Sequence, residues 1–283
     1  MLQRDVKIMT LENIKAILER LILESDSNRI PAELALRPEL AGMKIFQKSL
    51  VGCADASDPI FPEMKADFKA YGDMLRLPCD WLPGAKSVIS FFLSYTDEIR
   101  VCDRPGSPYP SDEWLHARIE GQSFMLKACD KIIAELKAEG YKAIIPSASP
   151  VFTVSRDDAR AAAGGPLFAA NWSERHGAYA AGLGTFGLAK HLITEIGVCG
   201  RFGSIITDAP IAPTPRAYSS PYEYCSFCGK CALRCPSSAI GKREKDNAPC
   251  SDFINRTKEL FPPRYGCGKC QIGMPCENGI PVK

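Results

Sequence analysis

The stretch "CSFCGKCALRCPSSAI", residues 225–240, decides how the C-terminal part of this chain is organised. It contains the cysteines Cys225, Cys228, Cys231 and Cys235. Their spacing, C-x2-C-x2-C-x3-C followed by proline, is typical of iron–sulfur ligands, because two-residue gaps let three thiolates wrap one face of a cubane cluster. In two-cluster proteins the fourth cysteine of such a run ligates the other cluster. The motif therefore predicts two 4Fe-4S clusters.

The remaining ligands are expected from "YGCGKCQIGMPCENGIP", residues 265–281, and from Cys250. Two cubanes need eight thiolates, and eight of the 13 cysteines lie between residues 225 and 276. Each cluster requires four ligands, and matching the available cysteines to this requirement gives a first cysteine set of Cys225, Cys228, Cys231 and Cys276. The second cysteine set is then Cys235, Cys250, Cys267 and Cys270. The competing interpretation of the second set is a tetrathiolate zinc site, but the shared run ending in Cys-Pro favours iron.

Composition is that of an ordinary globular protein of 283 residues, 46% hydrophobic and 24% charged. A formal net charge of +2 gives no basic field for nucleic acid or an anionic membrane, so charge does not support tRNA as a partner. The N-terminal segment, residues 1–26, carries charges throughout and is predicted to be an amphipathic helix instead of a signal peptide. No apolar run approaches the ~18 residues of a membrane span. A cytoplasmic location follows, where the cysteines outside the two sets stay reduced.

Hydrophobic periodicity predicts an α/β fold. The expected elements are a helix at 10–24, a strand at 85–95, a helix at 112–139, a strand at 141–147, a helix leading into a glycine-rich loop at 171–194, and a strand at 200–211. Residues 25–80 show no clear period. Prolines and serines at 212–222 mark a boundary between a domain at 1–215 and a second domain at 216–283.

Three segments resemble a known family. "ERHGAYAAGLGTFGLAKHLIT" (174–194), "GRFGSIITDAPI" (200–211) and the cysteine-rich tail with its "YGCGKC" are similar to epoxyqueuosine reductases and reductive dehalogenases. The approach to the first core strand, "DWLPGAKSVISFFLSY", is similar as well, so the resemblance covers most of residues 80–281. The glycine-rich loop is no dinucleotide fingerprint, because a helix precedes it where a strand is required.

The resemblance implies a nitroreductase-like cobalamin-binding domain followed by a small ferredoxin-like domain that holds two 4Fe-4S clusters. Electrons from a ferredoxin-type or flavodoxin-type donor would pass through both clusters and reduce the corrin cobalt to Co(I). This reaction is expected under anaerobic conditions. Glycines would let the backbone approach the large planar ring. The expected corrin-binding residues are Gly182, Gly184, Thr185, Phe186, Gly187, Thr194 and Ser204. The alternative is that these glycines only cap and turn a helix.

The resemblance also places a proton donor at the start of the helix at 112–139. The family has an Arg-Asp-Tyr-His stretch there, and "SDEWLHARI" matches its histidine with His116 but has Trp114 at the aspartate position. His116 is the first candidate, because histidine titrates near neutral pH, and Asp112 is the second. The alternative for Asp112 is a first-turn charge that the helix dipole keeps ionised. The alternative for His116 is a packed or solvated helix residue.

Two functions are consistent with these features. The first is an iron–sulfur, cobalamin-dependent reductase of a small-molecule or modified-nucleoside substrate, epoxyqueuosine in tRNA among them. The alternative is a non-catalytic two-cluster electron carrier, or a reductive activator of a corrinoid protein. A carrier needs only about 60 residues to hold two clusters, whereas some 220 residues here precede the cysteines. A domain of that size usually builds a pocket, which favours the enzyme.

Overall fold

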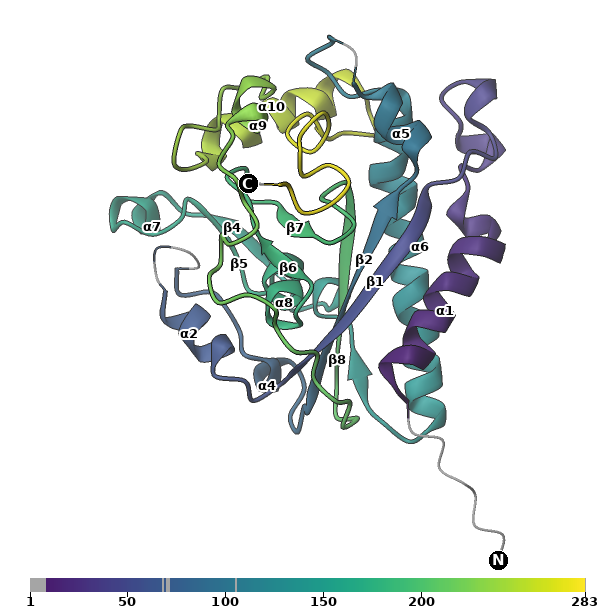
Figure 1. The fold of residues 1–283 in the computed structure, drawn as a ribbon, viewed down its shortest axis with the longest axis vertical. Helices are drawn as coiled ribbons and strands as arrows, with labels where there is room; N and C mark the ends of the chain where they lie inside the picture. Colours follow the sequence, from purple (N-terminus) through teal and green to yellow (C-terminus); the bar gives the residue numbers. More distant parts are fainter. Residues whose placement is uncertain (1–8, 68, 70–71, 105, 283) are drawn as a thin grey trace, which may run out of the picture.

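A computed structural model describes residues 9–282 except 68, 70–71 and 105 (Figure 1). Its centre is a four-stranded sheet of order β1-β2-β8-β3, in which every pair is antiparallel. The strands are β1 (Phe46–Asp55), β2 (Ser87–Tyr95), β8 (Gly200–Thr207) and β3 (Ala143–Ile144). All nine residues of β2 are buried, because protein covers both faces of the sheet. This explains why its sequence is apolar without alternation.

Alternate residues of the central strands feed two separate cores. Ile89 and Ile205 belong to the main core with the helices α1 (Leu11–Glu24) and α6 (Asp112–Ala138). Their neighbours Val88 and Ile206 face the other way, into a second core that includes the end of α8 (Glu174–Ala180). Figure 1 shows α1 and α6 on one side of the sheet and α8 on the other. The sheet thus lies between two helical layers.

Shorter elements surround the sheet. Two small hairpins pair β4 with β5 and β6 with β7. The remaining elements are α2 (Ile60–Ala66), α4 (Pro78–Trp81), α5 (Asp97–Cys102), β4 (Val154–Arg156), α7 (Asp158–Ala162), β5 (Phe168–Ala170), β6 (Gly184–Phe186), β7 (Leu192–Thr194), α9 (Lys230–Leu233) and α10 (Asn247–Leu260). Among the described helices, none is both long and apolar enough to cross a membrane.

The long elements predicted from periodicity are confirmed. The helices at 10–24 and 112–139 are α1 and α6, and the Ser111 hydroxyl caps α6 by accepting a hydrogen bond from the Trp114 amide (3.2 Å). The first eight residues of the N-terminal segment lie outside the described part of the chain. The strand at 141–147 pairs over two residues only, because Pro146 begins a 3-10 turn. The strand β1 was not predicted.

The C-terminal segment packs onto one end of the sheet, at the top of Figure 1. Ile272 is fully buried in the main core, and Lys269 Nζ donates to the Asp103 carboxylate (3.1 Å) beneath α5. Arg264 forms a buried ion pair with Glu120 of α6 (2.6 Å). These contacts fix the cysteine-rich tail against the sheet and its helices. The division at 215/216 stays a prediction.

Candidate functional site

The first cysteine set lines one small cavity beside α9. Its members Cys225, Cys228, Cys231 and Cys276 all border this cavity. Gly229 starts α9 with φ +73°, a left-handed conformation that lets the chain turn between Cys228 and Cys231. The Phe227 amide donates a hydrogen bond to Cys225 Sγ (3.4 Å). Backbone amides directed at sulfur are a feature of iron–sulfur ligation.

The second cysteine set lines a larger cavity of about 360 Å³. Cys250 lies on α10, Cys235 follows α9, and Cys267 and Cys270 lie in the loop after α10. The Ala239 amide donates to Cys235 Sγ (3.3 Å). The structure therefore brings the eight cysteines together in the same two groups of four that ligand counting gives.

The four sulfur atoms of each cysteine set lie around a cavity and do not meet at a single centre. Within the described residues, no three His, Cys, Asp or Glu side chains are placed to hold a single metal ion. Burial, together with nearby cysteines, raises the pKa of Cys231 to about 11 and the pKa values of Cys267 and Cys276 to about 12. Crowded thiolates repel one another, so these sites need a cationic centre to hold four of them deprotonated.

His191 lies between the two cavities and lines both. Its Nε2 is 3.7 Å from Cys276 Sγ, and its buried Nδ1 has no hydrogen-bond partner. Burial, together with the charges of Arg175 and Lys245, lowers the pKa of His191 to about 3, so the imidazole is neutral. Sequence reasoning did not single out His191. The available signal was a histidine directly before the apolar residues Leu192 and Ile193 of β7.

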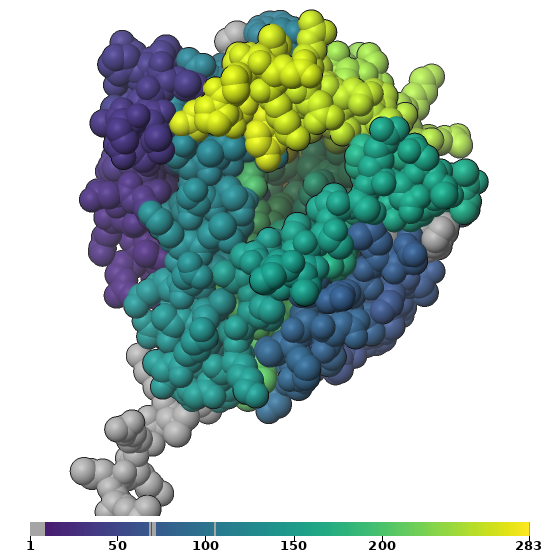
Figure 2. All heavy atoms as spheres, turned by 180° about the vertical axis from the view of Figure 1, so that it is seen from behind, coloured from purple at the N-terminus to yellow at the C-terminus, as the bar shows by residue number. Residues whose placement is uncertain are grey.

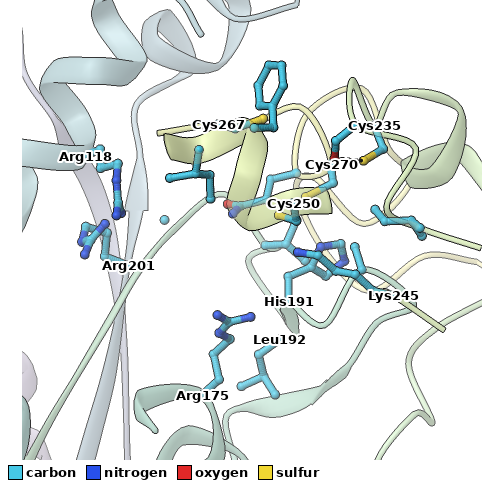
Figure 3. A pocket seen from close by; sticks show the side chains of 18 of the residues that line it. Arg118, Arg175, His191, Leu192, Arg201, Cys235, Lys245, Cys250, Cys267 and Cys270 are labelled. Carbon is cyan, nitrogen blue, oxygen red and sulfur yellow. Dashed lines mark hydrogen bonds between the residues drawn. The ribbon is translucent and has the colours of Figure 1, made fainter. Parts of the chain in front are cut away.

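The wall of the larger cavity opposite the cysteines is cationic. Arg118 of α6, Arg175 of α8 and Arg201 of β8 line it, whereas Lys245 lines the cavity closer to the cysteines (Figure 3). In Figure 3 the guanidinium groups of Arg118 and Arg201 lie next to each other, and Arg175 points into the space beneath the cysteines. Figure 2 shows a hollow beneath the C-terminal segment, on the side of the molecule away from Figure 1.

Glu174 at the start of α8 brings a carboxyl group to the same cavity. Both carboxyl oxygens are buried and accept no hydrogen bond. Burial raises the pKa of Glu174 to about 7, although the nearby hydroxyls of Ser204 and Ser147 act in the opposite direction. This group can therefore take up and release a proton near neutral pH.

The expected corrin-binding glycines contact protein instead of open space. Gly182 ends α8 in a Schellman motif, in which the Leu183 amide bonds the Ala178 carbonyl (3.0 Å), as the helix-cap interpretation expects. A Cβ on Gly184 would lie 1.9 Å from the Ile193 carbonyl oxygen across the β6–β7 hairpin. A Cβ on Gly187 would lie 2.7 Å from the His191 ring.

The other expected corrin-binding side chains have partners within the protein. Thr185 Oγ1 accepts from the Tyr224 amide (2.8 Å) and Ser204 Oγ accepts from the Trp172 indole (2.8 Å). Thr194 Oγ1 donates to the Gly197 carbonyl (2.7 Å), and the ring of Phe186 packs against those of His176 and Tyr179. None of the seven expected residues lines the larger cavity. Their assignment to a corrin stays a prediction.

The two expected proton donors also lie outside the larger cavity. His116 is fully buried, where its Nε2 accepts from the Leu36 amide (3.1 Å) and its Nδ1 contacts the Glu120 carboxylate (3.0 Å). Asp112 forms a surface ion pair with Arg37 (2.8 Å). Both residues are engaged with protein, His116 as part of the network that holds Arg264.

Comparisons with known proteins agree with the resemblance. No family model matches the chain. The chain is 30% identical over 212 residues to the epoxyqueuosine reductase of Bacillus cereus, which covers 70% of this chain and 50% of that protein. The chain thus spans about half the length of the curated relative that it matches.

Two solved structures share the fold. One is an epoxyqueuosine reductase with an epoxyqueuosine-modified tRNA stem loop (TM-score 0.52, 18% identity, 96% of this chain and 68% of that chain). The other is a catabolic reductive dehalogenase (TM-score 0.53, 15% identity, 82% of this chain and 30% of that chain). The fold is therefore a mixed α/β fold of this kind. The predicted relation to epoxyqueuosine reductases is confirmed, and the fold is shared with a reductive dehalogenase.

Proposed function

We propose that the chain is an iron–sulfur, cobalamin-dependent reductase related to epoxyqueuosine reductase. One observation carries the proposal: the second cysteine set lines the same cavity as side chains of α6, α8 and β8. A cluster on these cysteines would adjoin any group that binds against the sheet. An electron carrier has no use for such a cavity, whereas a reductase needs one next to its cluster.

The two cysteine sets fit two cubanes. Each set offers four thiols around one cavity, and the sulfur atoms of Cys225 and Cys235 each accept a hydrogen bond from a backbone amide. Thiols spread around a space suit a cubane better than the single ion of the zinc alternative, which requires ligands that meet at one centre. The first set would form one cluster and the second set the other.

Electrons would enter at the first cysteine set. Cys228 is exposed, and the neighbouring Phe227 is 51% exposed, so this edge is open to a ferredoxin-type or flavodoxin-type donor. His191 lies between the two cysteine sets and lines the cavity of each. The route then runs from the surface through the first cluster to the second cluster and ends at the cavity.

A corrin would lie beside the second cysteine set, partly inside the cavity that these cysteines line, and the binding role of the β6–β7 hairpin stays a prediction. When bound, a corrin supplies a cobalt that can be reduced to Co(I), a strong nucleophile and reductant. A volume of about 360 Å³ is at the small end for a ligand site, so it would enclose only part of so large a group. The remainder would lie in the open hollow of Figure 2. Glu174 would exchange a proton beside the reacting group.

The substrate class is a small molecule or a modified nucleoside. A formal net charge of +2 provides no field that attracts tRNA, so a free nucleoside or another small electrophile fits this chain better. The reducing cytoplasm would keep the cysteines available for iron.

The test is anaerobic purification and reconstitution with iron and sulfide, followed by metal analysis and absorption spectra with and without added cobalamin. We expect about eight irons per chain, and cobalt retained after gel filtration. Reduction by a chemical donor should then convert the corrin spectrum to that of Co(I). Full iron without retained cobalt would support the electron carrier and contradict the reductase.

A further inference from the structure

Three arginines from three different elements converge on the larger cavity. Arg118 comes from α6, Arg175 from α8 and Arg201 from β8, and all three line the same space. Figure 3 shows their guanidinium groups on the side away from the cysteines. Lys245 adds a fourth positive charge. Within the described lining, the one carboxylate that faces them is Glu174.

None of these arginines is paired with a carboxylate among the residues that the structure describes. The buried arginines Arg264 and Arg100, in contrast, are paired with Glu120 (2.6 Å) and with Asp97, whereas Arg118 and Arg201 are half-buried and Arg175 is exposed. Burying a charge without a partner is costly. An unpaired group of cations inside a cavity therefore indicates a site that is completed by an anion.

The protein contacts of the three arginines leave donors free. Arg201 donates to the Gln122 amide oxygen and Arg175 to the Lys190 carbonyl, while Arg118 stacks on the Tyr265 ring at 4.4 Å. The Nε groups of Arg118 and Arg201 are buried and have no partner. A guanidinium has five N–H donors arranged to bind carboxylate or phosphate through two parallel hydrogen bonds.

The cysteines alone do not balance this charge. Burial lowers the pKa of Arg118, and the charge of Arg201 lowers it further. The groups that oppose this effect at Arg118 are Tyr265 and Tyr95, not cysteines. Arg175 is exposed to solvent, and Cys270 and Cys250 favour its charged form. Arg118 therefore has no carboxylate or thiolate among the groups that favour its charged form, and Arg201 has Glu174 as its one nearby carboxyl group in the described lining.

We propose that Arg118, Arg175 and Arg201 bind the carboxylate or phosphate group of an organic anion, and that the substrate of the reductase carries such a group. The second part rests on the proposed function, whereas the first does not. Phe202, Phe253 and Leu192 line the same cavity and offer apolar contact to the body of the ligand. The cationic wall would hold the anionic end of the substrate while its reacting atom faces the second cysteine set.

The test uses small probes and the reconstituted iron–sulfur protein, without reductant and without cobalamin. Titration calorimetry with benzoate should give saturable binding, and benzamide, which has a similar shape and no charge, should bind at least about tenfold more weakly. Inorganic phosphate should compete with benzoate. Phosphate binding without benzoate binding would narrow the ligand to phosphate compounds. Binding of neither probe, or equal binding of benzoate and benzamide, would overturn the proposal.

Substitutions then assign the binding to these side chains. Arg118→Gln and Arg201→Gln should each weaken benzoate binding about tenfold with iron content unchanged. Arg201→Lys should restore only part of the affinity, because lysine keeps the charge and loses the paired donors. The matched control is Arg156→Gln, an exposed arginine that pairs with Asp158 outside the cavity. The control should bind benzoate as the parent does.

Two further results would contradict the site. If the arginine variants lose iron and the remaining protein still binds benzoate, the cations balance the cluster and not a ligand. If cobalamin loading abolishes benzoate binding, the arginines belong to the cofactor. Failure of the reductase proposal would show instead as missing cobalt or missing Co(I), with anion binding intact, so the two failures are distinguishable.

Discussion

His191 Nε2 lies 3.7 Å from Cys276 Sγ, and the same ring lines both cysteine cavities. Hydrogen bonds to ligating sulfur set the reduction potential of an iron–sulfur cluster. His191→Leu would remove the one imidazole placed between the two sets while keeping an apolar group of similar bulk. We expect the potential of the first cluster to fall, because a donor next to its sulfur is lost. Redox titration followed by electron paramagnetic resonance measures this change.

The control for His191 is His176→Leu, a histidine whose ring packs on Phe186 away from both cavities. Its cluster potentials should match those of the parent. If His191→Leu leaves both potentials unchanged as well, the imidazole does not act on the cluster sulfurs and serves only to fill space.

The division of the cysteines gives a second prediction. Cys250→Ser should abolish the cluster of the second set and leave that of the first, whereas Cys276→Ser should do the reverse. Each variant should therefore retain about half of the roughly eight irons, with different resonance spectra. Cys79→Ser is the control, because Cys79 is exposed and belongs to neither set. Zinc in place of the iron in the second set would refute the two-cubane assignment.

The cysteine grouping could be inferred from sequence because ligand number and spacing constrain it locally. The cationic wall could not, since Arg118, Arg175 and Arg201 are far apart in sequence and meet only through the fold. The strand β1 was missed because it lies at the sheet edge and its burial follows no clear alternation. The ligand role of the glycine-rich loop stays a prediction, because its glycines also fit a helix cap and a close hairpin without any ligand.

His116 is expected to act on stability and not on proton transfer. His116→Ala would leave the Leu36 amide and part of the Glu120 carboxylate without a buried partner, which costs about 1–3 kcal/mol of unfolding free energy. Asp112→Ala breaks an exposed ion pair and should cost about 0–1 kcal/mol. Urea denaturation of both variants measures the difference. Equal losses would mean that the buried network around Arg264 does not depend on the histidine.

Glu174 should give the protein a distinct pH dependence of stability. Its folded pKa of about 7 lies above the ordinary value of 4.5, chiefly because burial disfavours the charged carboxylate. Between these two values the folded state binds more protons than the unfolded state, so stability falls as pH rises from 4.5 to about 7 and changes little above that. The full loss corresponds to roughly 3 kcal/mol of unfolding free energy.

Glu174→Gln removes the ionisation and should therefore be more stable than the parent at pH 8, with a smaller difference at pH 5. The control is Glu39→Gln, an exposed glutamate whose substitution should leave the difference between pH 5 and pH 8 unchanged. Urea denaturation at both pH values measures these differences. A Glu174→Gln variant with the parent's pH dependence would show that the carboxyl group is already ionised, through the nearby arginines, and is no proton donor near neutral pH.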